Sequence, residues 1–99
     1  MTPRNRIATG DLAGQLAHAL RNTGRGLAAA GATFADVVRL RFYLKDWQPE
    51  KSPEFAAGLE LVAEELKLPN PLPPVSAIGV DYLFEPDVLV EVEAYAVLD

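Results

Sequence analysis

The side chains best suited to binding or catalysis are charged and aromatic ones, which recur at every second position in two segments. They are Arg39, Arg41 and Tyr43 in one segment and Glu91, Glu93 and Tyr95 in the other. A repeat of two places such side chains on one face of a β-strand. A guanidinium there can hold an anion, and a glutamate can orient a water molecule for attack on an electrophilic carbon. Opposite charges on neighbouring strands also form structural ion pairs, which is their commoner role, so both interpretations stay open.

The other candidate residues have ordinary structural explanations. His18 is the only histidine and the chain has no cysteine, so we expect neither a metal site nor another cofactor. Trp47 can border a ligand, but such residues more often pack at the corner between a strand and a helix. Tyr43 and Tyr95 can stack on a planar ligand or pack at an interface.

Two amphipathic helices are predicted to support these strands. The first begins after Asp11 as its N-cap and ends before Gly31, with apolar residues at three- and four-residue steps between them. The second begins with Ser52 as N-cap and Pro53 at the first helical position. Its buried stripe is predicted to comprise Phe55, Leu59, Val62 and Leu66.

Three strands are predicted from alternation and from turn residues. Residues 36–46 alternate between apolar and polar, and the apolar face is formed by Val38, Leu40, Phe42 and Leu44. Four prolines between positions 69 and 74 favour an extended connector, after which residues 75–81 form a short strand. Residues 88–98 form the last strand, after a turn at residues 85–87.

The order helix, strand, helix, strand, strand indicates the fold class. It predicts an α/β (α+β) domain in which two helices pack on one face of a small mixed sheet. No predicted helix remains to cover the other face, which carries the charged and aromatic side chains.

Length and composition are those of one globular domain over residues 1–99. Apolar residues make up 49% of the chain, which is too many for a disordered protein. No apolar run approaches the roughly 20 residues of a membrane span and no signal peptide is apparent, so we expect a cytoplasmic protein without a membrane partner. The formal net charge of −5 and the scattered basic residues argue against nucleic acid as a partner.

Four blocks of sequence, at residues 27–32, 36–40, 43–46 and 89–97, are together similar to the RidA, or YjgF, superfamily of reactive-intermediate deaminases. The most specific block contains Val-Glu-Val-Glu-Ala in the last strand. This resemblance implies a chorismate-mutase-like fold that assembles as a homotrimer around a barrel-like centre, with the helix-free faces turned inward. It also implies small-molecule clefts between subunits, in which enamines and imines are hydrolysed.

The chain departs from the family's pattern at its N-terminus. Members usually begin with about three further strands, so we interpret residues 1–99 as an N-terminally shortened domain. In the family one of those strands lies beside the final strand, so residues 88–98 are expected to present an open edge. Residues 1–10 folding back, a strand from a partner, or a truncated gene product would each account for this arrangement.

The resemblance also suggests which residues form the site. The family's short strand commonly opens with Pro-Ala-Arg-Ser, whose arginine holds the substrate carboxylate, and the matching stretch here is Pro73-Pro74-Val75-Ser76. Valine cannot bind a carboxylate, so a 2-imino acid would be a poor substrate. The acidic residue that positions water in the family matches Glu91, the candidate catalytic residue. The candidate substrate-binding residues are Val75, Ser76, Arg39, Arg41 and Tyr43.

Three functions agree with these observations. The first is a RidA-like homotrimer that binds a small molecule between subunits and has lost or altered the imine deaminase activity. The second is an active hydrolase of enamines or imines that lack a carboxylate, with Glu91 orienting water and Arg39 or Arg41 assisting. The third is a structural or regulatory protein that pairs its open strand edge with another chain. The ribonuclease and translation-inhibitor activities attributed to the family rank last because the chain is acidic.

Overall fold

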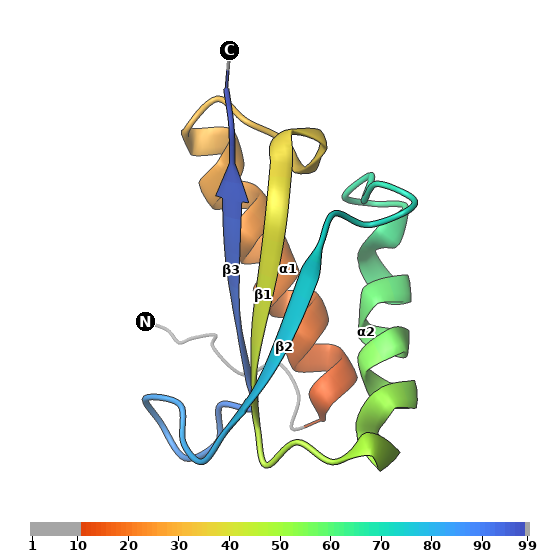
Figure 1. Cartoon of the computed structure of the whole chain (residues 1–99), viewed down its shortest axis with the longest axis vertical. Coiled ribbons are helices and arrows are strands. Elements are labelled where there is room, and N and C mark those ends of the chain that lie inside the picture. Colours follow the sequence, from red (N-terminus) through yellow and green to blue (C-terminus); the bar gives the residue numbers. More distant parts are fainter. Residues whose placement is uncertain (1–10, 99) are drawn as a thin grey trace.

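The computed structural model describes residues 11–98, which contain two α-helices and three strands (Figure 1). In chain order the elements are α1 (Leu12–Ala29), the 3-10 helix η1 (Phe34–Asp36), β1 (Val37–Lys45), the 3-10 helix η2 (Pro49–Lys51), α2 (Ser52–Ala63), β2 (Val75–Val80) and β3 (Val90–Ala96). The order of helices and strands is the predicted one. None of the helices in this part of the chain has the length and apolar character needed to span a bilayer.

The three strands form one mixed sheet with β1 in the middle. The order is β2-β1-β3, with β2 parallel to β1 and β3 antiparallel to it. A parallel pair needs a long connection, and α2 lies within the one that joins β1 to β2. Figure 1 shows α1 behind the sheet and α2 along its β2 side, so the near face carries no helix. The predicted mixed sheet with two supporting helices is therefore confirmed.

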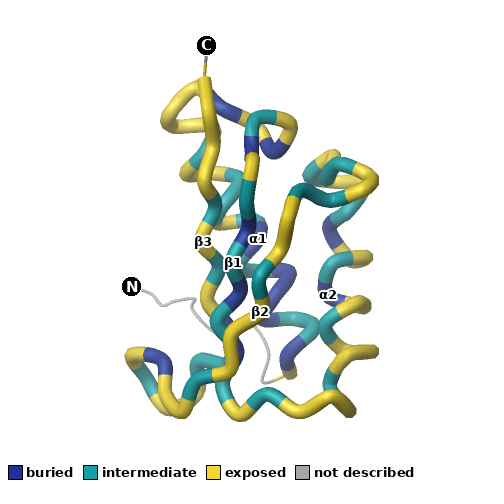
Figure 2. Tube along the Cα trace, in the orientation of Figure 1, coloured by how far each residue is buried: buried dark blue, intermediate teal, exposed yellow. Residues whose placement is uncertain are grey.

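The core lies between β1 and the two helices. Its largest fully buried side chains are Leu16, Leu20, Leu40, Phe42, Leu44 and Val62. Figure 2 shows buried positions along α1 and β1 where the two elements face each other. The rings of Phe42 and Phe55 meet edge-on with centroids 5.0 Å apart, and Trp47 meets Phe55 in the same way at 6.1 Å. Trp47 therefore packs at the corner between β1 and α2.

The ends of α1 are set by its caps. The Asp11 carboxylate accepts a hydrogen bond from the Gly14 backbone N–H at 2.8 Å. At the other end, Gly31 has a φ of 81°, in the left-handed region that glycine adopts without strain. Both ends agree with the prediction.

The start of β1 differs from the prediction because the strand contains a bulge. The pairing with β3 shifts register between Val37 and Arg39. As a result Val37 is 6% exposed, whereas Val38, which was predicted on the apolar face, is 50% exposed. An extra residue in one strand reverses which positions face the core, so the predicted alternation holds only from Leu40 onwards.

The start and end of α2 also differ from the prediction. The 3-10 helix η2 runs directly into α2, so Ser52 already has helical backbone angles and Lys51 occupies the N-cap position. Lys51 makes no side-chain capping bond, and the predicted Ser52 cap was wrong. The helix ends at Ala63, so Leu66 lies beyond it, although Leu66 still packs half-buried against the core.

Both outer strands have an edge without a partner strand in residues 11–98. β3 covers Val90–Ala96 and is shorter at both ends than the predicted strand. The open edge expected for the final strand is therefore present in the described chain. Residues 1–10, one of the segments expected to cover it, lie outside the described residues.

The two helices approach each other closely at Gly58. A Cβ atom at this position would lie 2.9 Å from the Ala13 carbonyl oxygen and 2.9 Å from two side-chain atoms of Leu16. Real Cβ atoms do not approach neighbours this closely, and backbone cannot move aside easily. Gly58 therefore sets the packing distance between α1 and α2.

Gly58→Ala is expected to destabilise the protein by about 1–3 kcal/mol, because the added methyl group forces the helices apart. Gly26→Ala is the matched control, because a Cβ at Gly26 meets nothing within 4 Å. This second change should stabilise α1 by roughly 0.5–1 kcal/mol through helix propensity. Urea unfolding at one fixed protein concentration measures both, and equal midpoints for the two variants would contradict the packing argument.

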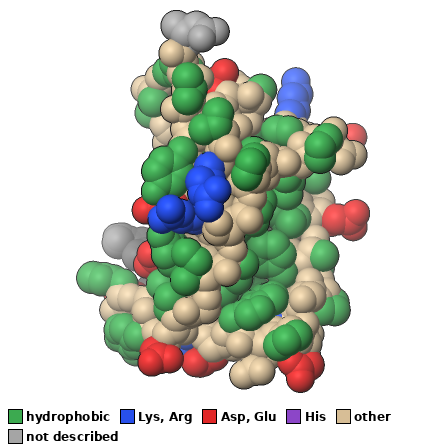
Figure 3. Space-filling view, viewed as in Figure 1, with side chains coloured by type: hydrophobic (Ala, Val, Ile, Leu, Met, Phe, Trp, Pro, Cys, Tyr) green, Lys and Arg blue, Asp and Glu red, His purple; other side chains and the backbone are tan. Residues whose placement is uncertain are grey.

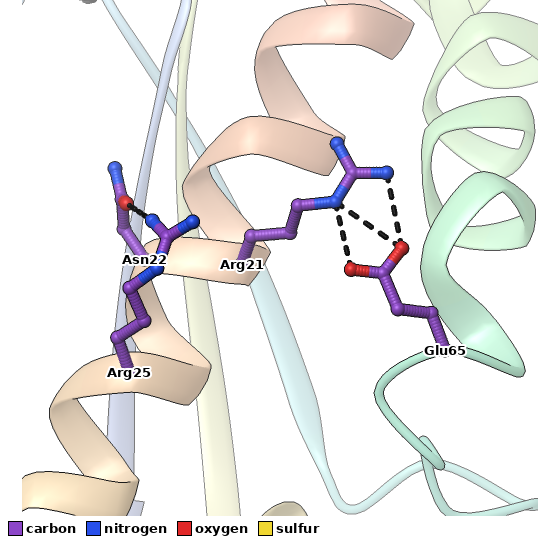
Figure 4. Close-up of polar contacts among 4 residues, drawn as sticks. All are labelled: Arg21, Asn22, Arg25 and Glu65. Atoms are coloured by element: carbon purple, nitrogen blue, oxygen red, sulfur yellow. Dashed lines mark hydrogen bonds and ion pairs between the residues drawn. The ribbon is translucent and has the colours of Figure 1, made fainter.

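A second contact between α1 and the turn after α2 is an ion pair. The Arg21 guanidinium donates to both carboxylate oxygens of Glu65, with Nε 2.9 Å from Oε2 and Nη2 3.1 Å from Oε1 (Figure 4). This bond lowers the pKa of the Glu65 carboxyl below its ordinary value. Both side chains are about half exposed, so solvent screening keeps the contribution small.

Glu65→Gln is expected to lower the urea midpoint at pH 7 and to leave it unchanged at a pH below the folded-state pKa of the Glu65 carboxyl. A carboxyl whose pKa is lower in the folded state stabilises folding above its ordinary pKa of 4.5. That stabilisation disappears as the pH falls through the folded-state pKa, because both proteins then carry a neutral group. Glu60→Gln is the control, since Glu60 is exposed on α2 and makes no bond with another described residue. An equal effect of Glu65→Gln at both pH values would exclude the ion pair as the cause.

Candidate functional site

Strand register gathers the predicted site residues on the helix-free face of the sheet. Across β1 and β3, Arg39 lies opposite Tyr95, Arg41 opposite Glu93, and Tyr43 opposite Glu91. On the other side of β1, Ser76 lies beside Arg41 and Ile78 beside Tyr43. Figure 3 shows this face, with Lys and Arg side chains in one patch near its centre and hydrophobic side chains around them. The face assigned from the repeat of two is therefore correct for these positions.

Arg39 and Arg41 reach towards different neighbours. The Arg39 Nη2 donates a hydrogen bond to the Ser76 hydroxyl across the parallel β1–β2 pair. The Arg41 guanidinium lies over the Tyr95 ring, with its central carbon 5.7 Å from the ring centroid. The pKa of Arg41 is raised above its ordinary value. The larger cause is hydrogen bonding with Tyr43, and the next is charge interaction with Tyr95. The Arg41 Nε is buried and makes no hydrogen bond with the described residues.

The carboxylates on this face are not paired with the arginines. Tyr43 and Tyr95 both donate their hydroxyl hydrogens to Glu93 Oε1, at 3.0 Å and 3.2 Å. Glu91 is exposed and forms no hydrogen bond or ion pair with any other residue between 11 and 98. The expected cross-strand ion pairs are therefore absent from the described chain, although Glu93 lies directly opposite Arg41. Glu93 instead accepts hydrogen bonds from two tyrosine hydroxyls, and Arg41 makes a cation–π contact with the Tyr95 ring.

Val75 lies apart from the other predicted site residues. It opens β2 in register with Leu40, which places it on the side of the sheet that faces the helices, and it is 42% exposed. Glu91 lies on the opposite face and on the other outer strand. Two strand spacings and a three-residue offset separate their Cα atoms by roughly 14 Å. Within one chain, Val75 and Glu91 do not form one site.

Gln15 is a residue that sequence reasoning missed. It is 7% exposed and lies in the first turn of α1, among the buried residues of that helix. Its Nε2 donates to the Asp87 carbonyl at 2.9 Å, and its Oε1 accepts from the Leu89 backbone N–H at 2.8 Å. These bonds hold the start of β3, and so position Glu91. A polar residue beside the apolar stripe of a helix was the available signal.

Three hollows in the described chain lie away from these residues. One of about 270 Å³ lies near Trp47, between the first turns of α1 and α2. Another of about 410 Å³ lies beside Arg21 and Glu65, and a third of about 370 Å³ lies between the end of α1 and β3. None of the three is lined by a predicted site residue. Residues 11–98 also contain no cluster of three or more side chains able to hold a metal ion.

Comparisons with known proteins agree with this fold. The family model described as Endoribonuclease L-PSP matches residues 1–98. A member of the YjgF/YER057c/UK114 family from Mycobacterium tuberculosis is 34% identical with a TM-score of 0.73, over 92% of this chain and 71% of that one. YyfB of the Rid family, from Yersinia pestis, is 35% identical with a TM-score of 0.71, over 93% of this chain and 66% of that one.

The YjgF gene product of E. coli is 28% identical with a TM-score of 0.77, over 97% of this chain and 72% of that one. The chain thus spans about two-thirds to three-quarters of the length of these proteins. A search of curated protein sequences found no match. The matched model, the sequence identity and the shared mixed sheet place the chain in the RidA (YjgF/YER057c/UK114) family.

Proposed function

We propose that this RidA family member binds a small molecule in clefts between identical subunits and has lost or altered the family's imine deaminase activity. The observation that carries the proposal is Val75. The side chain at this position has neither charge nor a hydrogen-bond donor, so it offers nothing to a substrate carboxylate. Losing a charge-assisted bond to a desolvated anion costs a few kcal/mol, equivalent to roughly a hundredfold or more in affinity.

The separation of Val75 and Glu91 supports a site between subunits. The two residues lie on opposite faces and on different outer strands. A single small ligand cannot span that separation, so contact with both positions requires residues from a second copy. The open helix-free face and the partnerless edges of β2 and β3 agree with such an assembly. Family resemblance favours a homotrimer.

An active deaminase with an altered substrate is the second candidate. Glu91 favours it, because its carboxylate is exposed and makes no bond with another described residue. Such a carboxylate can accept a hydrogen bond from water and direct the oxygen towards an imine carbon. Addition of that water, followed by departure of ammonia, would give a carbonyl product. With valine at position 75, the substrate in this alternative carries no carboxylate at the family's position.

The charge of the chain argues against the ribonuclease activity that the family's description names. A chain with a net charge of −5 repels the phosphate backbone, and the basic residues form no continuous stripe for RNA.

The wild-type protein is expected to hydrolyse 2-iminobutyrate no faster than buffer alone, because Val75 cannot hold its carboxylate. Release of the 2-oxo acid measures the rate, and Glu60→Gln controls for unrelated effects of removing a carboxylate. Robust turnover that disappears in Glu91→Gln would overturn the proposed loss or alteration.

A panel of amine-derived imines without a carboxylate tests the second candidate. Uniform inactivity towards the panel would exclude it.

The protein is expected to sediment with three times the mass of one chain. Ile78→Glu should dissociate the assembly, because Ile78 is 37% exposed on the helix-free face beside Tyr43. Leu61→Glu, on α2 and 59% exposed, is the matched control and should remain assembled. A stable monomer, or equal dissociation by both changes, would contradict clefts formed around this face.

A further inference from the structure

We propose that the hollow beside Arg21 and Glu65 is a second ligand site, and that it binds an amphiphilic anion, a small molecule with one negative group and a compact apolar body. The hollow lies on the helix side of the molecule, between α1, η1 and the turn after α2. None of its lining residues belongs to the helix-free face of the sheet. The inference therefore goes beyond the proposed function and does not depend on it.

The first argument is the size and the fixed shape of the hollow. Its volume is about 410 Å³, within the range of about 300–1,000 Å³ that is usual for pockets with small ligands. The ion pair of Arg21 and Glu65 joins two of its walls, α1 and the turn after α2. Thr33 and Asp36 fix the third wall, η1, through a capping box in which the Thr33 backbone N–H donates to Asp36 Oδ2 at 2.9 Å. The hollow is therefore preformed, and a ligand loses little affinity to the ordering of its walls.

The second argument is the apolar part of the lining. Phe34 is buried and Leu66 is half-buried, and both approach α1 at Gly24. A Cβ atom at Gly24 would lie 3.3 Å from Phe34 Cε2 and 3.6 Å from Leu66 Cδ2. Ala28 and Ala32 line the same hollow, and their small side chains leave space that a larger residue would fill. An apolar group that replaces water against these side chains binds favourably, so the body of the ligand is apolar and compact.

The third argument is the charge at the rim. Arg21 and Arg25 lie one helical turn apart on α1, and both line the hollow (Figure 4). Arg21 is paired with Glu65, whereas Arg25 forms no ion pair with any residue between 11 and 98 and bonds the Asn22 side-chain oxygen through Nη1 alone. Two guanidinium groups and one carboxylate give the rim a net positive charge, on a chain whose net charge is −5. The remaining donors of Arg25 can hold an oxyanion.

Glu65 gives this site a signature that loss of folding cannot imitate. Its carboxylate occupies the Arg21 guanidinium and repels an anion bound beside Arg25. The pKa of the Glu65 carboxyl is lowered mainly by the hydrogen bond from Arg21 and to a smaller extent by the charge of Arg25, so the three groups act on one another. Replacing Glu65 with a neutral residue therefore frees Arg21, removes the repulsion and strengthens anion binding.

The test is a titration of the full chain with benzenesulfonate, measured by calorimetry and by amide NMR. Benzenesulfonamide is the uncharged molecule of the same shape, and inorganic sulfate is the anion without an apolar body. Benzenesulfonate should bind at least about tenfold more tightly than either, because only it uses both the guanidinium groups and the apolar lining. The amide signals of Ala28, Ala32 and Leu66 should shift. Equal affinity for either control compound, or shifts confined to the sheet, would overturn the site.

Substitutions of charged residues locate the anion. Arg25→Gln should weaken benzenesulfonate by about tenfold, because its guanidinium is lost, and Glu65→Gln should strengthen it several-fold. Arg39→Gln, on the helix-free face, is the matched control and should leave the affinity unchanged. Unchanged binding in Arg25→Gln, weaker binding in Glu65→Gln, or a loss in Arg39→Gln would each contradict the assignment to this hollow.

A substitution that keeps every charge tests the apolar part. Ala28 and Ala29 are both exposed on α1, and only Ala28 lines the hollow. Leucine favours helix, so either change should keep the fold. Ala28→Leu fills the hollow and should weaken benzenesulfonate by about tenfold or more, whereas Ala29→Leu should have no effect. Equal affinities of the two variants would overturn the site. Imine hydrolysis and sedimentation are separate readouts, so failure here leaves the proposed function in place.

Discussion

The two faces of the central strand β1 differ in chemistry, and this difference fixes the register of the whole sheet. Leu40, Phe42 and Leu44 pack under the helices, and the intervening side chains of Arg41 and Tyr43 lie on the opposite face. Because β1 is hydrogen-bonded on both sides, a slip of one residue would place charged groups in the core. Burying one unpaired charge costs on the order of several kcal/mol, which is comparable to the whole stability of a small domain.

The same register places the candidate site residues on two different faces of the sheet. Residues in register across β2, β1 and β3 share a face, so the arginines meet Ser76 and Tyr95, while Val75 belongs to the helix side. A ligand on the helix-free face therefore meets guanidinium groups, tyrosines and Glu91. A ligand at Val75 meets an apolar edge. Val75, where the family resemblance implies an arginine, therefore lies on the other side of the sheet from the two arginines of β1, which form no ion pair with the described residues.

Hydrogen bonds on the helix-free face explain why the arginines stay unpaired. Glu93 accepts from two tyrosine hydroxyls, and each such bond to a carboxylate is stronger than one between neutral groups. Arg41 is attracted by the Tyr95 ring, and Arg39 by the Ser76 hydroxyl. On the other side of the sheet, Gln15 joins α1 to the segment before β3 and so holds Glu91 in place. The positions of both the cations and Glu91 therefore depend on residues from several elements.

Local sequence was enough to predict the order of the helices and strands, the caps of α1 and the face on which Arg41 and Tyr43 lie. These features follow from local periods and capping residues, which need no knowledge of distant neighbours. Local sequence was not enough to predict the exposure of Val38, the start of α2 or the partners of the charged groups, which depend on contacts between distant segments. The bulge between Val37 and Arg39 changes which residues at the start of β1 face the core. The hydrogen-bond partners of the charged groups come from strands that are far apart in the chain. The placement of Val75 and Glu91 on opposite faces was also not predictable, because the sequence of a single strand does not specify the register across all three strands.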